Sequence, residues 1–498
     1  MGKKVSIFGK LALLSILGAS SFNYDVSQAR AATSIAPSVA AGSFHSLALK
    51  DDGTVWAWGN NDFGGLGNGT TKDSPIPIQV PNLNSVVKIA AGYGSSYAVK
   101  SDGTVWSWGK NNDGELGDGT LVKKLNPVQV PNLNGVVDIA AHFNSVFAVK
   151  SDGSVYAWGE NSNANLGIGV DIRNDKRPTP IKIKELSNII AVDTGPTNSL
   201  ALSSDGTVWG WGLNLNGLVG DGSTEKRISP VKVKNLESVK AISIGDGSMA
   251  VKNDGSLWNW GRCDISGFKS TCKAVDIRVP TQVPNVNELN DIVVGGNVAI
   301  ALRKDGTLRT WGYNHSGQLG VGTIGTRDIF YTPQTPVFPN MDPFDKVMSI
   351  EANDNHVLAI RNDGTVWAWG NNSSGQIGEG TIGGKKPYPT STGLQLISND
   401  QLQLGQTVQL DIPNGTTKSY TFVSPKDGTV TISTGFLDMK ADTILNVYDS
   451  NGTLLETNDD YNNSTYSSIL LNVTANTRYT IEVSGFQKAG VRCILKIE

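Results

Sequence analysis

Residues 45–67 read HSLALKDDGTVWAWGNNDFGGLG, and this stretch decides the fold. At its centre an Asp-Gly pair, Asp52-Gly53, separates two short runs of apolar and small residues. Glycine adopts a positive φ at low cost and aspartate tolerates one, so the pair predicts a tight turn between antiparallel strands. The stretch therefore predicts a β-hairpin whose second strand is Trp56-Ala57-Trp58-Gly59.

The same unit occurs seven times along the chain. Its Asp-Gly pairs begin at Asp52, Asp102, Asp152, Asp205, Asp254, Asp305 and Asp363. Each pair precedes a Trp-x-Trp-Gly strand, in which Tyr156 and Arg309 replace the first tryptophan of two units. A short apolar strand precedes the hairpin, and Asn-x-x-Gly-x-Leu-Gly-x-Gly with an extended segment typically follows it. About four strands per unit and no helical periodicity predict an all-β fold, a seven-bladed β-propeller over residues 36–397.

All twelve tryptophans belong to this repeated strand. We interpret their large rings as filling the wedge between neighbouring blades, with a carbohydrate-stacking role as the alternative. The pattern of residues 45–67 has echoes at residues 95–117 and 356–378, and it resembles the regulator of chromosome condensation repeats. Members of that family are seven-bladed propellers, so the resemblance implies the same architecture here.

The first 31 residues have the three parts of a secretory signal peptide. These are a basic start with Lys3, Lys4 and Lys10, an apolar stretch at 11–18, and the cleavage pattern Ala29-Arg30-Ala31. A retained membrane anchor or a disordered N-terminus is the alternative. No other segment approaches the roughly 18 apolar residues of a membrane span. We therefore expect a monomer that is secreted, and that is extracellular or associated with the cell surface.

The formal net charge is −3, and removal of residues 1–31 lowers it to −6 because four basic residues and one acidic residue are lost. An acidic protein lacks the basic surface that phosphate backbones require, which argues against nucleic acid as a partner. Three cysteines are present. Cys263 and Cys272 lie in one loop and could form a disulfide, with two free thiols as the alternative, and Cys493 has no evident partner.

Residues 402–498 alternate apolar and polar side chains between turn residues, which predicts a small β-sandwich. The segments 442–452 and 458–460 resemble the bacterial pre-peptidase C-terminal domain, an extracellular sandwich appended to secreted proteins. Some relatives bind calcium, so the resemblance makes Asp442, Asp459 and Asp460 candidate calcium ligands. A solvated acidic turn without a metal is the alternative.

The sequence offers no catalytic constellation. His45 and His356 occupy one slot of the repeat, where another unit has Val298, so the slot is a packing position. The units differ most in the turn before the second strand, and these turns are expected on one face of the propeller. There we predict five partner-binding residues: Phe44, Tyr93, Phe143, Asn297 and Asn355. The alternative is that the three aromatic rings fold back onto the blade edges.

We therefore predict a secreted, non-enzymatic scaffold that recognises a protein or cell-envelope ligand through one propeller face. A secreted bacterial member of the resembled family grips an enzyme with aromatic loop residues in this way. The alternative is guanine-nucleotide exchange on a small GTPase, the activity of the eukaryotic family namesake. The signal peptide and the acidic charge argue against that alternative, and a shared fold does not imply a shared function.

Overall fold

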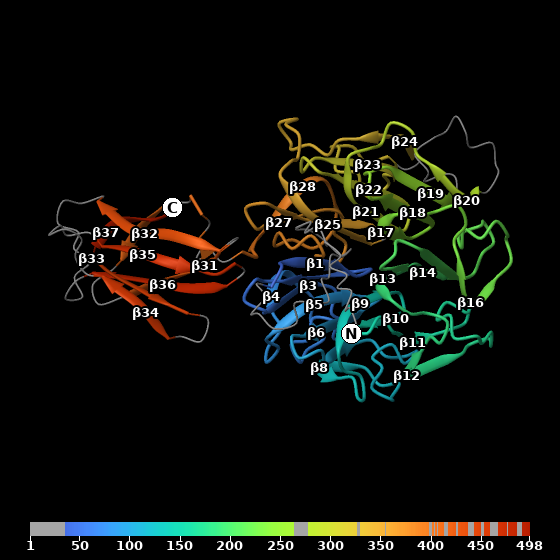
Figure 1. Ribbon diagram of the computed structural model, residues 1–498. Helices are drawn as coiled ribbons and strands as arrows, with labels where there is room; N and C mark the ends of the chain where they lie inside the picture. The colour runs from blue at the N-terminus through green and yellow to red at the C-terminus, as the bar shows by residue number, and fades with distance from the viewer. Residues whose placement is uncertain are drawn as a thin grey trace, which may run out of the picture.

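The computed structural model describes residues 35–262, 277–325, 329–353 and 355–397, and, with short gaps, residues 401–498. Every regular element in these ranges is a β-strand. Seven four-stranded antiparallel sheets follow one another in chain order, each built from four consecutive strands. Figure 1 shows these sheets side by side in a ring. The prediction of an all-β fold is confirmed.

The strands of the seven sheets are β1 (Ser38–Ala41), β2 (His45–Leu49), β3 (Val55–Gly59), β4 (Ser74–Gln79); β5 (Val86–Ala91), β6 (Ser95–Lys100), β7 (Val105–Gly109), β8 (Lys124–Gln129); β9 (Val136–His142), β10 (Ser145–Lys150), β11 (Val155–Glu160), β12 (Lys176–Lys182); β13 (Ile189–Thr194), β14 (Asn198–Ser203), β15 (Val208–Gly212), β16 (Arg227–Lys232); β17 (Val239–Ile244), β18 (Gly247–Lys252), β19 (Leu257–Gly261), β20 (Ile277–Gln282); β21 (Leu289–Gly295), β22 (Val298–Arg303), β23 (Leu308–Tyr313), β24 (Ile329–Gln334); and β25 (Val347–Asn353), β26 (His356–Arg361), β27 (Thr365–Asn371), β28 (Lys385–Gln395).

The second tryptophan of each Trp-x-Trp strand packs between two neighbouring sheets and fills the wedge-shaped space between them. Trp58, Trp108 and their five equivalents are at most 1 % exposed. The Trp108 indole N–H donates to the Gly65 carbonyl of the preceding sheet at 2.8 Å. This contact explains the Leu-Gly of the motif, because a Cβ on Gly67 would lie 2.8 Å from the Trp108 Nε1. One apolar cluster fills each of the seven wedges between neighbouring sheets.

The Asn of the repeated loop holds that loop in place. The Asn61 side-chain oxygen accepts a hydrogen bond from the Leu66 N–H at 3.0 Å. Its amide nitrogen donates to the carbonyls of Thr70 and Lys72, both at 3.1 Å. The equivalent residues Asn111 and Asn372 make the corresponding bonds in their own loops. One buried asparagine side chain therefore pairs with backbone N–H and C=O groups that have no partner in a strand.

The ring closes by side-by-side packing between the seventh and first sheets. Strand β1 contacts β25 and β26. The Ser46 hydroxyl donates to the Gln376 carbonyl at 2.9 Å, and the same hydroxyl oxygen lies 3.0 Å from Nε2 of His356. His45 repeats this contact with Ser96 at 2.9 Å. Both histidines are fully buried, so the prediction that they occupy a packing position is confirmed.

The remaining strands form two C-terminal sheets, shown in orange to red in Figure 1. They are β29 (Gln401–Leu402), β30 (Thr407–Ile412), β31 (Thr417–Val423), β32 (Gly428–Phe436), β33 (Thr443–Tyr448), β34 (Leu454–Asn458), β35 (Ser468–Val473), β36 (Arg478–Gly485) and β37 (Val491–Ile497). One sheet has the order β29-β31-β36-β33-β34 and the other β30-β37-β32-β35. A single apolar cluster, which includes the buried Cys493, draws residues from both sheets.

Candidate functional site

The turns that join the first and second strands of the seven sheets all lie at one end of the ring, and we call them the inner turns. Backbone hydrogen bonds connect several of them from sheet to sheet. The Ser43 N–H donates to the Gly92 carbonyl at 3.3 Å, and the Tyr93 N–H donates to the Phe143 carbonyl at 2.9 Å. Because the next turn approaches so closely, a Cβ on Gly92 would lie 2.7 Å from that carbonyl oxygen. The inner turns of the first three sheets therefore form a continuous edge.

Aromatic side chains lie in series along this edge. The ring centroids of Phe44 and Tyr93 are 5.4 Å apart, and those of Tyr93 and Phe143 are 6.0 Å apart with nearly parallel planes. Phe63, from the loop after β3, lies 6.4 Å from Tyr93. All four rings are half-buried. We call Phe44, Phe63, Tyr93 and Phe143 the aromatic rim. The other three rings each contact Tyr93, and all four still present part of their surface to solvent.

Phe143 adopts a backbone conformation that a bulky residue rarely takes. Its φ is +46°, and it stands first in a two-residue turn, since His142 pairs with Ser145. In the sixth sheet the same turn position is held by Gly296, with φ +53°. A non-glycine residue in this region costs on the order of 1–3 kcal/mol. The sequence thus places a large ring where glycine is the less strained choice.

A buried ionic network supports the aromatic rim. The Lys110 ammonium lies 3.0 Å from Glu115, 3.3 Å from Asp113 and 5.7 Å from the centroid of the Tyr93 ring. It also donates to the side-chain oxygen of Asn144, at 2.7 Å, in the inner turn of the third sheet. Burial works to raise the pKa of Asp113, but its pairs with Lys176 and Lys110 hold that pKa below its ordinary value. Both Lys110 and Glu115 are buried, and through Lys110 the network contacts the Tyr93 ring and Asn144, which follows Phe143 in its turn.

The five predicted partner-binding residues all lie on inner turns. Phe44, Tyr93 and Phe143 are in contact, whereas Asn297 and Asn355 stand in the sixth and seventh sheets, outside the aromatic series. The side-chain oxygen of Asn355 lies 2.9 Å from Nε2 of His315. Sequence reasoning missed Phe63, because it lies in the loop after the third strand rather than in the variable turn.

The predicted calcium ligands Asp442, Asp459 and Asp460 lie outside the described residues, as do Cys263 and Cys272 of the predicted disulfide. Within the described ranges, no group of three or more His, Cys, Asp or Glu residues could hold a metal ion. The described residues contain no membrane-spanning helix, since their regular elements are all strands.

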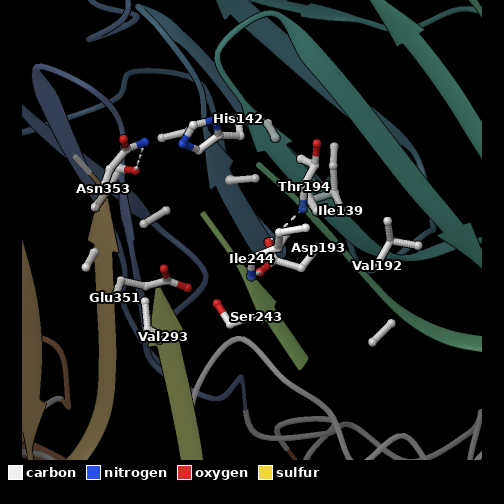
Figure 2. A pocket seen from close by; sticks show the side chains of 18 of the residues that line it. Ile139, His142, Val192, Asp193, Thr194, Ser243, Ile244, Val293, Glu351 and Asn353 are labelled. Atoms are coloured by element: carbon white, nitrogen blue, oxygen red, sulfur yellow. Dashed lines mark hydrogen bonds between the residues drawn. The ribbon is translucent and has the colours of Figure 1, made fainter. Parts of the chain in front are cut away.

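The ring encloses a central cavity of about 120 Å³. Its wall is made by the seven innermost strands, β1, β5, β9, β13, β17, β21 and β25. Figure 2 shows Asp193, Ser243, Glu351, Asn353 and His142 around this cavity. Burial raises the pKa of Asp138 to about 7 and that of Asp193 to about 6, and it lowers the pKa of His142 to about 4. The cavity therefore contains desolvated carboxyl groups and a neutral imidazole.

Comparison with known proteins gives consistent matches. The model of the RCC1-like domain matches residues 8–335, and the model of the regulator of chromosome condensation (RCC1) repeat matches residues 347–376. The mouse E3 ubiquitin-protein ligase HERC2 is 28 % identical over 215 residues, which are 41 % of this chain and 4 % of HERC2. The Arabidopsis thaliana ultraviolet-B receptor UVR8 is 30 % identical over 210 residues, 41 % of this chain and 46 % of the receptor.

Among solved structures, a chain in the crystal structure of Kap60 bound to yeast RCC1 (Prp20) superposes with a TM-score of 0.60 at 20 % identity. The superposition covers 79 % of this chain and 91 % of that one. At this identity the match shows a common fold. The chain spans less than half the length of the two curated relatives named above.

Proposed function

Because this chain belongs to the RCC1-like domain family, we propose that it is a non-enzymatic binding scaffold whose inner-turn face recognises a protein. We propose further that residues 1–31 direct it out of the cell, so that the partner is an extracellular or cell-envelope protein. The seven sheets would then be the blades of a propeller, and the two C-terminal sheets a β-sandwich of the pre-peptidase C-terminal kind. Yeast RCC1 has been crystallised bound to another protein, Kap60, which is consistent with this use of the fold.

The observation that carries the proposal is the aromatic rim. Half-exposed aromatic rings dominate the binding energy of protein interfaces, because they bury a large area at a low cost in side-chain entropy. Here the four rings come from three sheets, and the ammonium of the buried Lys110 lies over the ring of Tyr93, which the other three rings contact. Phe143 keeps its ring at the edge at the cost of a strained backbone. Strain of this kind is found at functional sites more often than in ordinary turns.

The decisive variant is Phe143→Gly. Glycine removes the strain at φ +46°, which offsets the roughly 0.5–1.5 kcal/mol of lost contact with Tyr93 and His142. We expect the free energy of unfolding to stay the same or to rise, while affinity for the partner falls at least about tenfold. Denaturant unfolding measures the first quantity. Capture from culture medium and envelope extract, followed by titration of the captured protein, measures the second.

Tyr93→Ala is the companion variant, and Tyr156→Ala is the matched control. Tyr156 is also a half-buried tyrosine, but it lies next to an Asp-Gly turn at the other end of the ring. Tyr93→Ala should weaken binding and Tyr156→Ala should not. Equal affinity of the wild type, Phe143→Gly and Tyr93→Ala for every captured protein would refute the proposal. Accelerated nucleotide release from a small GTPase would instead support the exchange activity.

A further inference from the structure

The ionic network that contacts the aromatic rim has more acidic than basic groups. Three carboxylates and two ammonium groups belong to it: Asp113, Glu115, Glu160, Lys110 and Lys176. The neutral side chain of Asn144 joins Glu160 to the others, because its amide nitrogen donates to Glu160 at 3.0 Å and to Asp113 at 2.9 Å. Three carboxylates and two ammonium groups leave the network with one excess negative charge.

Both ammonium groups pair with carboxylates of the second sheet's loop. The Lys110 ammonium lies 3.0 Å from Glu115 and 3.3 Å from one oxygen of Asp113. The Lys176 ammonium lies 2.9 Å from the other oxygen of Asp113 and donates to the Asn112 carbonyl at 2.8 Å. The positive charge of the network is therefore concentrated around Asp113 and Glu115.

Glu160 has a neutral partner instead of a cation. It stands directly opposite Lys176 in the ladder between β11 and β12, but the Lys176 side chain extends to Asp113. Within the described residues the Glu160 carboxylate accepts a hydrogen bond from the Asn144 amide and forms no ion pair. The hydrogen bond to Asp113 is the main cause that raises the pKa of Lys176, and the charge of Glu160 adds a smaller contribution. The excess negative charge therefore lies at Glu160.

Glu160 lies against the turn that carries Phe143. Its N–H donates to the Asn144 carbonyl at 2.9 Å, and Asn144 follows Phe143 in the two-residue turn. Both Glu160 and Phe143 are half-buried, so each still presents part of its surface to solvent. An aromatic ring and a carboxylate without a paired cation therefore come together where the aromatic rim reaches the third sheet.

We propose that this end of the aromatic rim binds an arginine side chain of the partner protein, with the guanidinium against the Phe143 ring and paired with Glu160. The inference rests on the proposed function and adds the chemistry of the residue that the partner contributes. A planar guanidinium can stack on an aromatic ring and present two N–H groups to one carboxylate, which a lysine ammonium cannot do. Arginine is also one of the residues that most often dominate the binding energy of protein interfaces.

Other occupants fit this end of the rim less well. An anionic group would be repelled by the excess negative charge. A metal ion lacks ligands, because no three ligating groups of the described chain converge. An apolar side chain alone would cover the Phe143 ring but would leave the Glu160 carboxylate desolvated without a cation, which costs free energy.

Binding of arginine can be measured without a captured protein. The probe is Nα-acetyl-arginine methylamide, and Nα-acetyl-citrulline methylamide is the control, because citrulline has nearly the same shape without the charge. Saturation-transfer difference NMR on the full chain detects the weak binding that a single residue provides. The arginine probe should give a saturable titration, and the citrulline probe should bind at least about fivefold more weakly. Nα-acetyl-lysine methylamide should also bind more weakly than the arginine probe.

Glu160→Gln is the decisive variant for this inference. The glutamine keeps an oxygen that accepts the Asn144 hydrogen bond but removes the charge, so binding of the arginine probe should fall at least about fivefold. Phe143→Gly should weaken the probe as well. Glu237→Gln, at an exposed glutamate that follows β16 at the Asp-Gly end of the ring, is the matched control and should have no effect. A melting temperature equal to that of the wild type verifies that each variant is folded.

The captured protein provides a second readout. Its affinity for the wild type should fall as the salt concentration rises, and Glu160→Gln should make this dependence shallower, because one charge pair across the interface is lost. Treatment of the captured protein with phenylglyoxal, which modifies arginine, should weaken binding to the wild type more than binding to Glu160→Gln. Acetylation of its lysines should weaken binding to both equally, because the coupling belongs to an arginine.

The inference is wrong if the arginine and citrulline probes bind equally, if the lysine probe binds more tightly than the arginine probe, or if Glu160→Gln binds the arginine probe fully. A protein that is captured through Phe143 but binds Glu160→Gln with unchanged affinity and salt dependence would also overturn it, and the protein-binding function would stand. The expected results with the probes, but no captured protein, would leave the arginine site standing and count against the protein-binding function alone.

Discussion

Trp106 and Trp108 belong to one Trp-x-Trp strand, yet their surroundings differ. Trp108 is fully buried in the wedge and donates to the Gly65 carbonyl, whereas Trp106 is half-buried near the Asp-Gly turn. The Trp106 N–H reaches only the Thr104 hydroxyl, at 3.3 Å, while the Lys100 ammonium lies 4.6 Å from its ring centroid. The sequence predicts that both rings pack between sheets, but it does not distinguish the two environments.

Substitution of Trp106 or Trp108 by phenylalanine tests whether the two tryptophans contribute differently to stability. Trp108→Phe removes a buried hydrogen bond and leaves a cavity, so we expect a loss of about 2–4 kcal/mol in the free energy of unfolding. Trp106→Phe, the matched control, should cost less than about 1 kcal/mol, because its N–H bond is long and partly exposed. Denaturant unfolding of both variants measures the difference. Equal losses would contradict the assignment of the second tryptophan as the wedge.

At the scale of the elements, the contact between β2 and β26 depends on a neutral histidine. Burial lowers the pKa of His356 to about 3, with a further contribution from His45, whose own pKa burial lowers to about 4. In the unfolded chain a histidine titrates near 6.5. The unfolded state therefore binds more protons than the native state between these values. The stability that the neutral ring contributes is complete above about pH 6.5 and is lost as the pH falls toward 3.

His356→Gln keeps a side chain that can hydrogen-bond to Ser46 but cannot titrate. As the pH falls from 6.5 to 4.5, the free energy of unfolding of the wild type should fall more steeply than that of the variant. The two slopes should differ by about 1.4 kcal/mol per pH unit. Urea unfolding at several pH values measures both slopes. Parallel slopes for His356→Gln and the wild type would contradict the buried, neutral state.

The site was only partly predictable at this scale. The variable turns predicted Phe44, Tyr93 and Phe143, which are in contact, because a position that differs among the repeated units is not required for the common fold. Phe63 was missed, since its contact with Tyr93 depends on how two loops approach.

At the scale of the whole molecule, the chain has separate apolar cores. The cluster of the C-terminal sheets contains only residues from Leu402 onward, while the last wedge of the ring ends at Leu396, which is fully buried. The repeat predicted the number and order of the sheets of the ring. It could not predict the closing contact, because Ser46 and His356 are 310 residues apart and meet only in the folded ring.

Truncation after Ile397 tests this division. We expect the full chain to show two calorimetric transitions and the truncated chain to keep that of the ring at an unchanged temperature, because no apolar cluster joins the two parts within the described residues. A chain that ends at Gly393 is the control, since it also loses Leu394 and Leu396 from the last wedge. It should melt at a lower temperature. A single shared transition in the full chain would contradict the separation.

Each sheet of the ring consists of four consecutive strands of one unit, and none is completed by a strand from the far end of the chain. A tandem duplication or deletion in the gene that spans one unit would therefore add or remove a whole sheet and leave the others intact. The change would alter the diameter of the ring and the angle between neighbouring sheets, while each sheet kept its own four strands. Because one contiguous stretch of the gene encodes each sheet, a single recombination event can change the number of sheets. No intermediate is needed in which one sheet takes strands from distant parts of the gene.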